Sequence, residues 1–372
     1  MKRHSFKFTI ISLILLLAMS LPVFAQDYRL QSERYGTGGL SFEWWKADED
    51  KISSFALPLT FIYPVNPKMR LYAMTSPAFT SLNTGATSNL NGLSDIKWGG
   101  HYLILDDQYL VTFGMNLPMG KNKLKVEEYS VASVLSMPAF NFRVPSMGQG
   151  LDIQAGISSA REMNDFIIGY GVSYLFKGGF TPFDGLDGDY APGNEFTLTL
   201  GGDFGDIMAD MLYTFYSADK FDGDKIYQSG NRLLLQAYWM TKVKDYDVVL
   251  LVRERIKGKN KIQDFSSSGN DLETESKNSN ANQFQLCSDW YRPYGQDSRI
   301  KFSIDCRLYS DSEMTKSGGA TLFGFGGGLE KPLSPTITFN AELKYFIGKI
   351  KTGTESVNAM GLNLFGGVQV VL

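Results

Sequence analysis

Histidine and cysteine are scarce in this chain, which has 372 residues but only two of each. One histidine is His4, so His101 is the only one beyond the N-terminal region. A zinc site needs several His or Cys ligands, and Ser–His catalysis needs a histidine beside the nucleophile. We therefore expect no metal site, no cofactor, no catalytic residues and no enzymatic activity.

Long apolar runs are also missing. Beyond Ala25, no segment approaches the roughly 18 consecutive apolar residues that a membrane-spanning helix needs, and the mean hydropathy is −0.14. The chain is nevertheless rich in aromatic residues (13%) and contains 38 glycines. This composition is typical of a membrane β-barrel, in which lipid-facing and lumen-facing residues alternate. A secreted β-sandwich is the alternative.

The first 25 residues have the pattern of a secretory signal peptide. Basic Lys2, Arg3 and Lys7 precede an apolar run over 10–19, and a small residue, Ala25, marks the expected cleavage site. We expect residues 26–38 to form a short periplasmic segment and residues 39–372 to form a barrel in the bacterial outer membrane. The formal net charge of −3 gives no reason to expect a nucleic-acid partner.

Alternating apolar and polar residues predict strands along the whole mature chain. In Glu195–Asp203, for example, Phe196 and Leu198 alternate with Glu195 and Thr197. We count about sixteen such segments, or twelve to fourteen if the weaker ones fold otherwise. Short turns alternate with longer polar loops, such as 47–52, 81–92, 217–229 and 258–282, and both chain ends lie on the short side. This arrangement predicts an all-β, transmembrane, antiparallel up-and-down barrel with both termini in the periplasm.

The final strand supports this prediction. Leu362, Leu364, Val368 and Leu372 lie on one apolar face that runs to the C-terminus. Such a strand resembles the assembly signal of outer-membrane barrels, although it ends on leucine and not on an aromatic residue. The resemblance implies contact with the outer-membrane assembly machinery. Membrane lipid and lipopolysaccharide are the expected surroundings.

Charged residues in the predicted strands fall on the face opposite the lipid-facing one, as any barrel requires. We expect a basic wall from the segment 230–310, which would favour anionic or polarisable solutes. His101 is expected to be a hydrogen-bonded structural side chain in the lumen. The predicted pore-lining residues are Asp95, Lys97, His101, Asp152, Asp210, Arg232, Arg253, Arg255, Asp289, Lys301, Asp305, Arg307, Glu342 and Lys344.

The longest predicted loop, residues 118–150, is unusually apolar, and we call it the constriction loop. It contains a possible helix over 126–135 followed by several apolar residues. Loops of this length in compact structures are usually functional. We expect it to fold inward and narrow the pore, with Glu127, Glu128, Phe140, Phe142 and Arg143 at the constriction.

Several segments resemble a family of outer-membrane proteins. They are 92–97, Tyr102, Asp106-Asp107, 117–120, 148–150, 165–177 with Phe180-Thr181-Pro182, and 191–195. The family is the transporter-like proteins of phenol-degradation meta-pathways, distantly similar to outer-membrane transporters of fatty acids and other hydrophobic compounds. The resemblance implies uptake of small hydrophobic or aromatic compounds. The Asn-Pro-Ala motif of the fatty-acid transporters is absent from 26–38, so a fatty-acid gating mechanism is not expected.

The sequence thus favours a porin-like channel for passive uptake of a small-molecule solute. The alternative is a structural or adhesive barrel with a closed lumen and partner-binding loops. Solute flux through the barrel separates the two interpretations.

Overall fold

The computed structural model describes residues 34–105, 108–185, 188–263, 271–295, 297–353 and 355–372. The expected signal peptide, 1–25, lies outside the described residues, as does the pair Asp106-Asp107 of the family resemblance. The barrel begins earlier than expected, because β1 starts at Tyr35 and not at Gly39. Glycines at 36, 38 and 39 conceal the alternation that would have identified this part of the strand.

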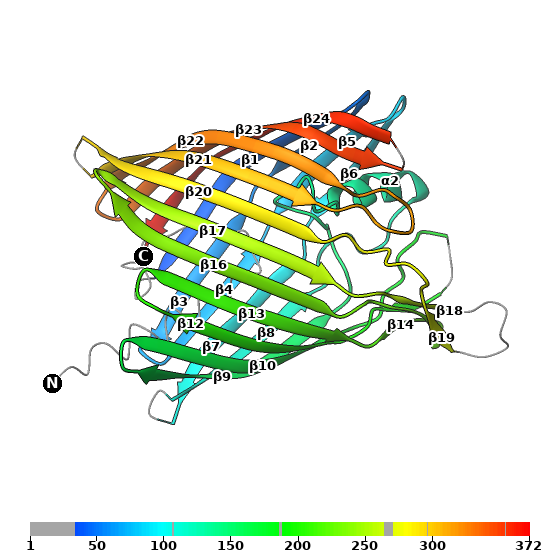
Figure 1. Cartoon of the computed structure of the whole chain (residues 1–372), viewed down its shortest axis with the longest axis horizontal. Helices are drawn as coiled ribbons and strands as arrows, with labels where there is room; N and C mark the ends of the chain where they lie inside the picture. The colour runs from blue at the N-terminus through cyan, green and yellow to red at the C-terminus, as the bar shows by residue number, and fades with distance from the viewer. Residues whose placement is uncertain (1–33, 106–107, 186–187, 264–270, 296, 354) are drawn as a thin grey trace.

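The chain forms a closed antiparallel barrel of 16 strands (Figure 1), which confirms the predicted fold and strand number. The barrel closes where β1 pairs with β24, from Tyr35 opposite Val371 to Ala47 opposite Ala359. Thirteen crossings are single strands: β1 (Tyr35–Ala47), β8 (Tyr109–Leu117), β9 (Asp152–Met163), β10 (Phe166–Lys177), β12 (Glu195–Asp203), β13 (Ile207–Tyr216), β16 (Arg232–Val243), β17 (Tyr246–Lys257), β20 (Gln283–Tyr294), β21 (Ser298–Tyr309), β22 (Ala320–Ser334), β23 (Ile337–Thr352) and β24 (Glu355–Val371).

The other three crossings are each broken into two strands. They are β2 (Asp50–Ala56) with β3 (Leu59–Asn66), β4 (Met69–Thr75) with β5 (Pro77–Asn83), and β6 (Thr87–Leu93) with β7 (Ile96–Ile104). Pro58 and Pro77 lie at two of the breaks, and proline cannot donate a hydrogen bond to the sheet. At the third break Asp95 leaves the ladder, and its buried carboxylate faces inward.

Short turns lie at one end of the barrel, with the start of β1 and the end of β24, and we call this the turn end (Figure 1). The opposite end, the loop end, carries the longer connections. Some of the predicted long loops are short hairpins. Segment 47–52 is a hairpin between Ala47 and Asp50, and 81–92 is a hairpin between Asn83 and Thr87. These strands extend past the lipid-facing region. Polar residues such as Asn83 and Asn89 lie on their outer face, while Ile52, Leu82 and Leu90 are buried inward, so the expected alternation is inverted.

A second sheet of five strands extends the wall at the loop end. It contains β11 (Tyr190–Ala191), β14 (Ala218–Phe221), β15 (Asp224–Gln228), β18 (Lys261–Gln263) and β19 (Leu272–Thr274). Segments 217–229 and 258–282 were predicted as loops, and this sheet corrects that prediction. Asp222 and Gly223 join β14 to β15 with φ values of 50° and 92°, which is the geometry of a tight hairpin turn.

The outer surface of the barrel wall is apolar. Leu198, Leu200, Phe302, Ile304 and Leu343 are among its exposed side chains. An exposed apolar belt on a closed sheet with polar groups inside is the arrangement of a transmembrane β-barrel.

The helix α2 (Val126–Leu135) matches the predicted helix. Within the described residues, no helix has the length and apolarity to span a membrane.

Candidate functional site: a lumen narrowed by the constriction loop

The constriction loop leaves β8 and returns to β9 through a narrow neck. The Asp95 carboxylate accepts hydrogen bonds from the backbone N–H groups of Gly120 (2.8 Å) and Gln149 (2.9 Å). It also accepts one from the Asn116 amide, at 2.8 Å. The two sides of the neck are in contact, because a Cβ built on Gly148 would lie 2.8 Å from the carbonyl carbon of Gly120. Asp95 therefore fixes the base of the loop.

Replacing Asp95 with alanine is expected to loosen this neck. The substitution leaves one buried donor and two half-buried donors without their acceptor, at a cost of about 1–3 kcal/mol. Trypsin cleavage of the folded protein after Lys121, Lys123 or Lys125 should then be faster than in the wild type. The exposed turn residue Asp245 provides a control, because Asp245→Ala removes a carboxylate far from the loop. Equal cleavage of both variants would show that Asp95 does not hold the neck.

Within the loop, α2 packs against β5 and β6. Val131 and Leu135 are buried with Leu82 and Leu90 in one apolar cluster. At the start of the helix, Glu128 pairs with Lys121 and accepts a hydrogen bond from the Lys125 backbone N–H. Burial opposes ionisation of Glu128, but these contacts with Lys121 and Lys125 hold the pKa of its carboxyl below the ordinary value. The first turn is thus fixed as an ion pair.

After the helix, the loop enters the barrel on an apolar part of the inner wall. The Phe140 ring lies 5.0 Å from the ring of Trp45 on β1, and Phe142 lies 6.0 Å from Phe140. Trp45 in turn lies 5.1 Å from Phe346 on β23. All four side chains are nearly fully buried. Because Trp45 and Phe346 lie on the inner face of their strands, these contacts place the loop inside the lumen.

Polar contacts hold the far part of the loop. The Arg307 guanidinium on β21 donates to the carbonyl oxygens of Ala139 (2.8 Å) and Phe140 (3.2 Å). It also forms a 3.0 Å ion pair with Asp305, and both side chains are almost completely buried. On β1, the Glu43 carboxylate accepts a hydrogen bond from the backbone N–H of Arg143, at 2.8 Å. Residues distant in sequence therefore anchor the loop.

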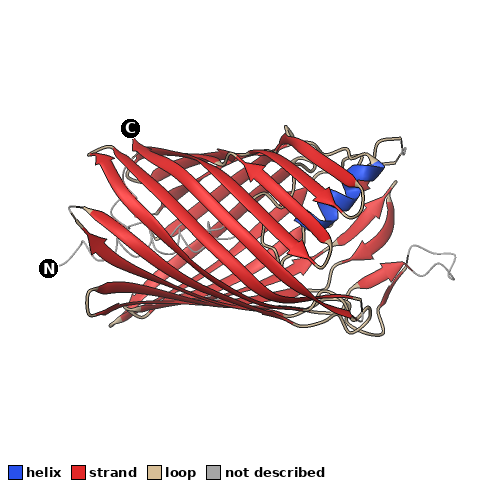
Figure 2. Cartoon of the chain, turned by 90° about the horizontal axis from the view of Figure 1, so that it is seen from above, coloured by secondary structure: helices blue, strands red, loops and turns tan. Residues whose placement is uncertain are grey.

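The loop lines the inner wall from β8, past β5 and β1, to β21. Figures 1 and 2 show α2 at the loop end of the barrel. The wall from β10 to β17 lies opposite and carries no contact with the apolar cluster of the loop. Among the predicted constriction residues, Phe140, Phe142 and Glu128 are buried in packing, Arg143 is half-buried and Glu127 is exposed. Met137, Asn141 and Ser146 are further exposed residues of the loop.

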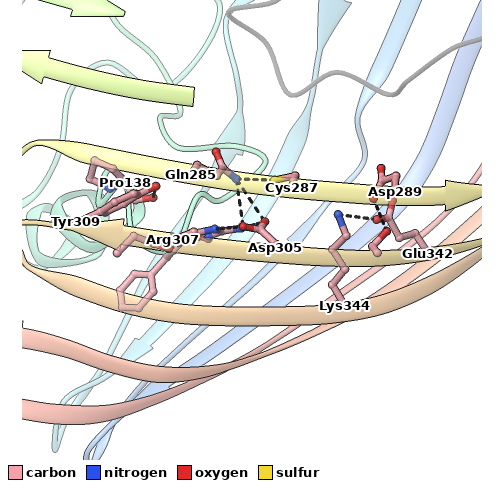
Figure 3. Close-up of polar contacts among 12 residues, drawn as sticks. Pro138, Gln285, Cys287, Asp289, Asp305, Arg307, Tyr309, Glu342 and Lys344 are labelled. Carbon is pink, nitrogen blue, oxygen red and sulfur yellow. Dashed lines mark hydrogen bonds and ion pairs between the residues drawn. The ribbon is translucent and has the colours of Figure 1, made fainter. Parts of the chain in front are cut away.

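The inner face of β20–β23 carries charges that neutralise one another (Figure 3). Lys301 lies 3.0 Å from Glu342 and 3.8 Å from Asp289, and Lys344 also lies 3.0 Å from Glu342. Arg307 is paired with Asp305. Lys301 and Arg307 therefore add little positive field to the lumen, and the predicted basic wall is narrower than the sequence suggested.

The remaining cations form a strip on β16 and β17, which we call the cationic strip: Arg232, Arg253, Arg255 and Lys257. Arg232 is 3.7 Å from Glu195, and Arg253 donates to the Gln236 amide oxygen at 3.2 Å. Among the described residues, Arg255 and Lys257 have no carboxylate within ion-pair distance. The strip faces the lumen across from the loop and makes this part of the inner wall positively charged.

Deeper in the same wall, Asp210 accepts a hydrogen bond from the Gln236 amide at 2.7 Å. Asp152 contacts the Gln149 side chain beside the loop neck, while Lys97 is exposed. His101 was expected to be a hydrogen-bonded side chain, but, among the described residues, the structure shows no partner for one of its two ring nitrogens. Its ring lies 5.7 Å from the Tyr72 ring, and within the described residues its buried Nδ1 has no partner.

Several residues that build the site were missed in the sequence. Glu43 and Ser41 lie on the polar face of β1 and could have been found by alternation alone. Trp45 and Phe346 could not have been found in this way. Alternation assigns polar residues to the inner face, whereas these two side chains are apolar because the constriction loop covers them. Among the described residues, no group of three His, Cys, Asp or Glu side chains could hold a metal ion.

Comparisons with known proteins give distant structural similarity only. No protein-family model matches the chain, and no curated protein matches it. A bacterial polysaccharide outer membrane secretin has a TM-score of 0.46 at 9% identity, over 91% of this chain and 98% of its own. The CymD monoaromatic hydrocarbon channel has a TM-score of 0.44 at 12% identity, over 93% of this chain and 90% of its own. An anion-selective porin from Comamonas acidovorans has a TM-score of 0.42 at 12% identity, over 91% of this chain and 98% of its own. These similarities are too distant to indicate a solute.

Proposed function

We propose that this protein is an outer-membrane channel for passive uptake of small solutes through a lumen narrowed by the constriction loop. The observation that carries the proposal is the loop itself, which is anchored inside the barrel by Arg307, Glu43 and the Trp45–Phe346 surface. A loop fixed against one wall reduces the cross-section without the need to fill the lumen. Pore diameter and lining charge then determine which solutes pass.

The same geometry supports the membrane and the orientation that we propose. A closed antiparallel barrel with an apolar outer belt is the structure that bacterial outer membranes contain. Both ends of the barrel sheet lie at the turn end, which we assign to the periplasm, and the loop end then faces outward. We also propose that the signal peptide is cleaved after Ala25.

We assign the solute to the class of small hydrophobic or aromatic compounds, the class that the family resemblance implies. The cationic strip adds a preference for solutes that also carry a negative charge. Aromatic rings with an anionic group satisfy both conditions, because an arginine side chain can contact a ring face as well as an anion.

Swelling of proteoliposomes tests this assignment. We expect benzenesulfonate to enter faster than phenyltrimethylammonium, because only the anion is attracted by the strip, and faster than a neutral sugar of similar mass. Flux of the sugar alone would contradict the aromatic preference. No flux of any solute would favour a structural or adhesive barrel with a closed lumen.

Neutralising the strip should change ion selectivity. In the double variant Arg253→Gln/Arg255→Gln, the anion-to-cation permeability ratio is expected to fall by about threefold or more, since lining charge raises the local counter-ion concentration. The reversal potential in a salt gradient measures this ratio. Lys331→Gln, at an exposed position near the turn end, is the control. An unchanged ratio in the double variant would exclude the strip as the selectivity element.

A further inference from the structure

A cavity of about 650 Å³ lies at the loop end, where β10 and β13 end, β12 begins and the five-stranded sheet adjoins the barrel wall. Figure 1 shows β14, β18 and β19 at this end of the barrel. The cavity is separate from the constriction loop, none of whose residues line it. Among the described residues that line it, four are lysines and one is an acid: Lys177, Lys220, Lys225, Lys261 and Asp271.

The lysine ammonium groups repel one another unless an anion lies between them. Lys220 and Lys225 are direct cross-strand partners in the β14–β15 hairpin, and like charges in that position destabilise a sheet. Lys261 lies on β18, which pairs with β15. Only Lys177 has an ion pair, with Glu195 at 2.6 Å. In the described part of the chain, the other three have no carboxylate within 4.0 Å.

Two acids of the neighbouring segments, Asp219 and Asp222, hold the loops around the cavity together. The Asp219 carboxylate accepts hydrogen bonds from the Tyr190 hydroxyl (2.6 Å) and the Gly193 backbone N–H (2.7 Å). Asp222 accepts one from the Asp189 backbone N–H at 2.8 Å. These carboxylates fix the loops that form the cavity and, within the described residues, make no ion pair with its lysines.

We propose that this cavity binds a phosphate-bearing anion with at least two negative charges. Its volume lies within the range of small-molecule sites, and lysine ammonium groups bind phosphate as point charges with several donors. Phe176, 47% exposed on the outer face of β10, also lines the cavity. The ligand can therefore be a free phosphorylated compound or the headgroup of a bilayer lipid, and the chemistry recognised is the same.

Titration with inorganic pyrophosphate tests the site on the full-length protein in a zwitterionic detergent. In the variant Lys220→Gln/Lys225→Gln/Lys261→Gln, the affinity should fall by about tenfold or more, because three charge-assisted contacts are lost. Asp271→Asn should strengthen binding, since it removes the one acid that lines the cavity. Binding should also weaken as salt concentration rises.

The matched control is Lys46→Gln/Lys51→Gln. These lysines are also cross-strand partners in a hairpin at the loop end, but they do not line the cavity. Pyrophosphate binding by this variant should equal that of the wild type. Circular dichroism of the triple variant confirms that its barrel is folded. Wild-type affinity in the triple variant, or the same loss in the control, would overturn the proposal.

Nanodiscs separate the two sources of phosphate. If the ligand is a lipid headgroup, phosphatidic acid should raise the thermal stability of the wild type above that in phosphatidylcholine, and the triple variant should show no such gain. If pyrophosphate binding differs between the wild type and the triple variant but the gain in stability with phosphatidic acid does not, the ligand is a soluble compound. If neither measurement differs between the two proteins, the site does not exist. Flux through the lumen is measured independently, so failure here leaves the proposed channel function unaffected.

Discussion

Deletion of residues 121–147 is expected to raise the single-channel conductance roughly two- to fivefold, because the loop occupies part of the pore cross-section. The structure makes this deletion feasible. Gly120 and Gly148 are already in backbone contact, so they can be joined without moving β8 or β9. Asp95 keeps its bonds to Gly120 and Gln149. Conductance in planar bilayers is the measurement.

The control for this experiment is deletion of residues 313–316. These exposed residues belong to the connection between β21 and β22 and have no part in the apolar cluster of the constriction loop. Their removal should leave the conductance unchanged. An unchanged conductance after deletion of 121–147 would mean that the loop does not narrow the conducting path.

Arg307→Met is expected to destabilise the barrel by about 3–5 kcal/mol, the usual cost of leaving one member of a buried ion pair without its partner. Methionine fills much of the volume, but the Asp305 carboxylate then stays buried without its cation. The carbonyl oxygens of Ala139 and Phe140 also lose their donor. Urea-induced unfolding in detergent micelles, followed by tryptophan fluorescence, gives the free energy of unfolding.

Two variants make this prediction specific. Arg299→Met removes an ion pair on the same strand, with Glu330 at 2.8 Å, but these side chains are about 30% exposed. Its cost should stay below about 1 kcal/mol, as for surface pairs. The double variant Asp305→Asn/Arg307→Met should recover part of the loss, because no charge remains buried. Equal costs for Arg307→Met and Arg299→Met would show that Arg307 is not a buried anchor.

Alternation of residues was sufficient to predict the barrel and the number of its strands. It works where one face meets lipid and the other meets water, since the two faces then differ in every second residue. It fails at the loop end, where segment 81–92 turns polar residues outward and buries Leu82 and Leu90 against the constriction loop, and so forms strand and not loop. At this end the sequence pattern also did not predict the strands β14, β15, β18 and β19.

The inward course of the constriction loop was predicted from its apolar residues, but its partners were not. Phe140 and Phe142 require burial, yet nothing local in the sequence indicates that Trp45 and Phe346 receive them. Arg307 was assigned to the lumen by parity, while its contact with a carbonyl 168 positions earlier depends on how the sheet closes. Ion pairing across strands likewise depends on register, which is why the basic wall was overestimated.

The most direct test of an open, narrowed lumen is chemical access to its middle. Thr199 lies half-buried on the inner face of β12, the same face as Thr197, whose hydroxyl contacts Thr214. We would place a single cysteine there, as Thr199→Cys in a Cys287→Ser/Cys306→Ser background, and add a small membrane-impermeant thiol reagent to either side of a planar bilayer. Modification from both sides, with bulkier reagents admitted only after deletion of 121–147, is the predicted result. Modification from one side alone would contradict a continuous pathway and indicate a closed barrel.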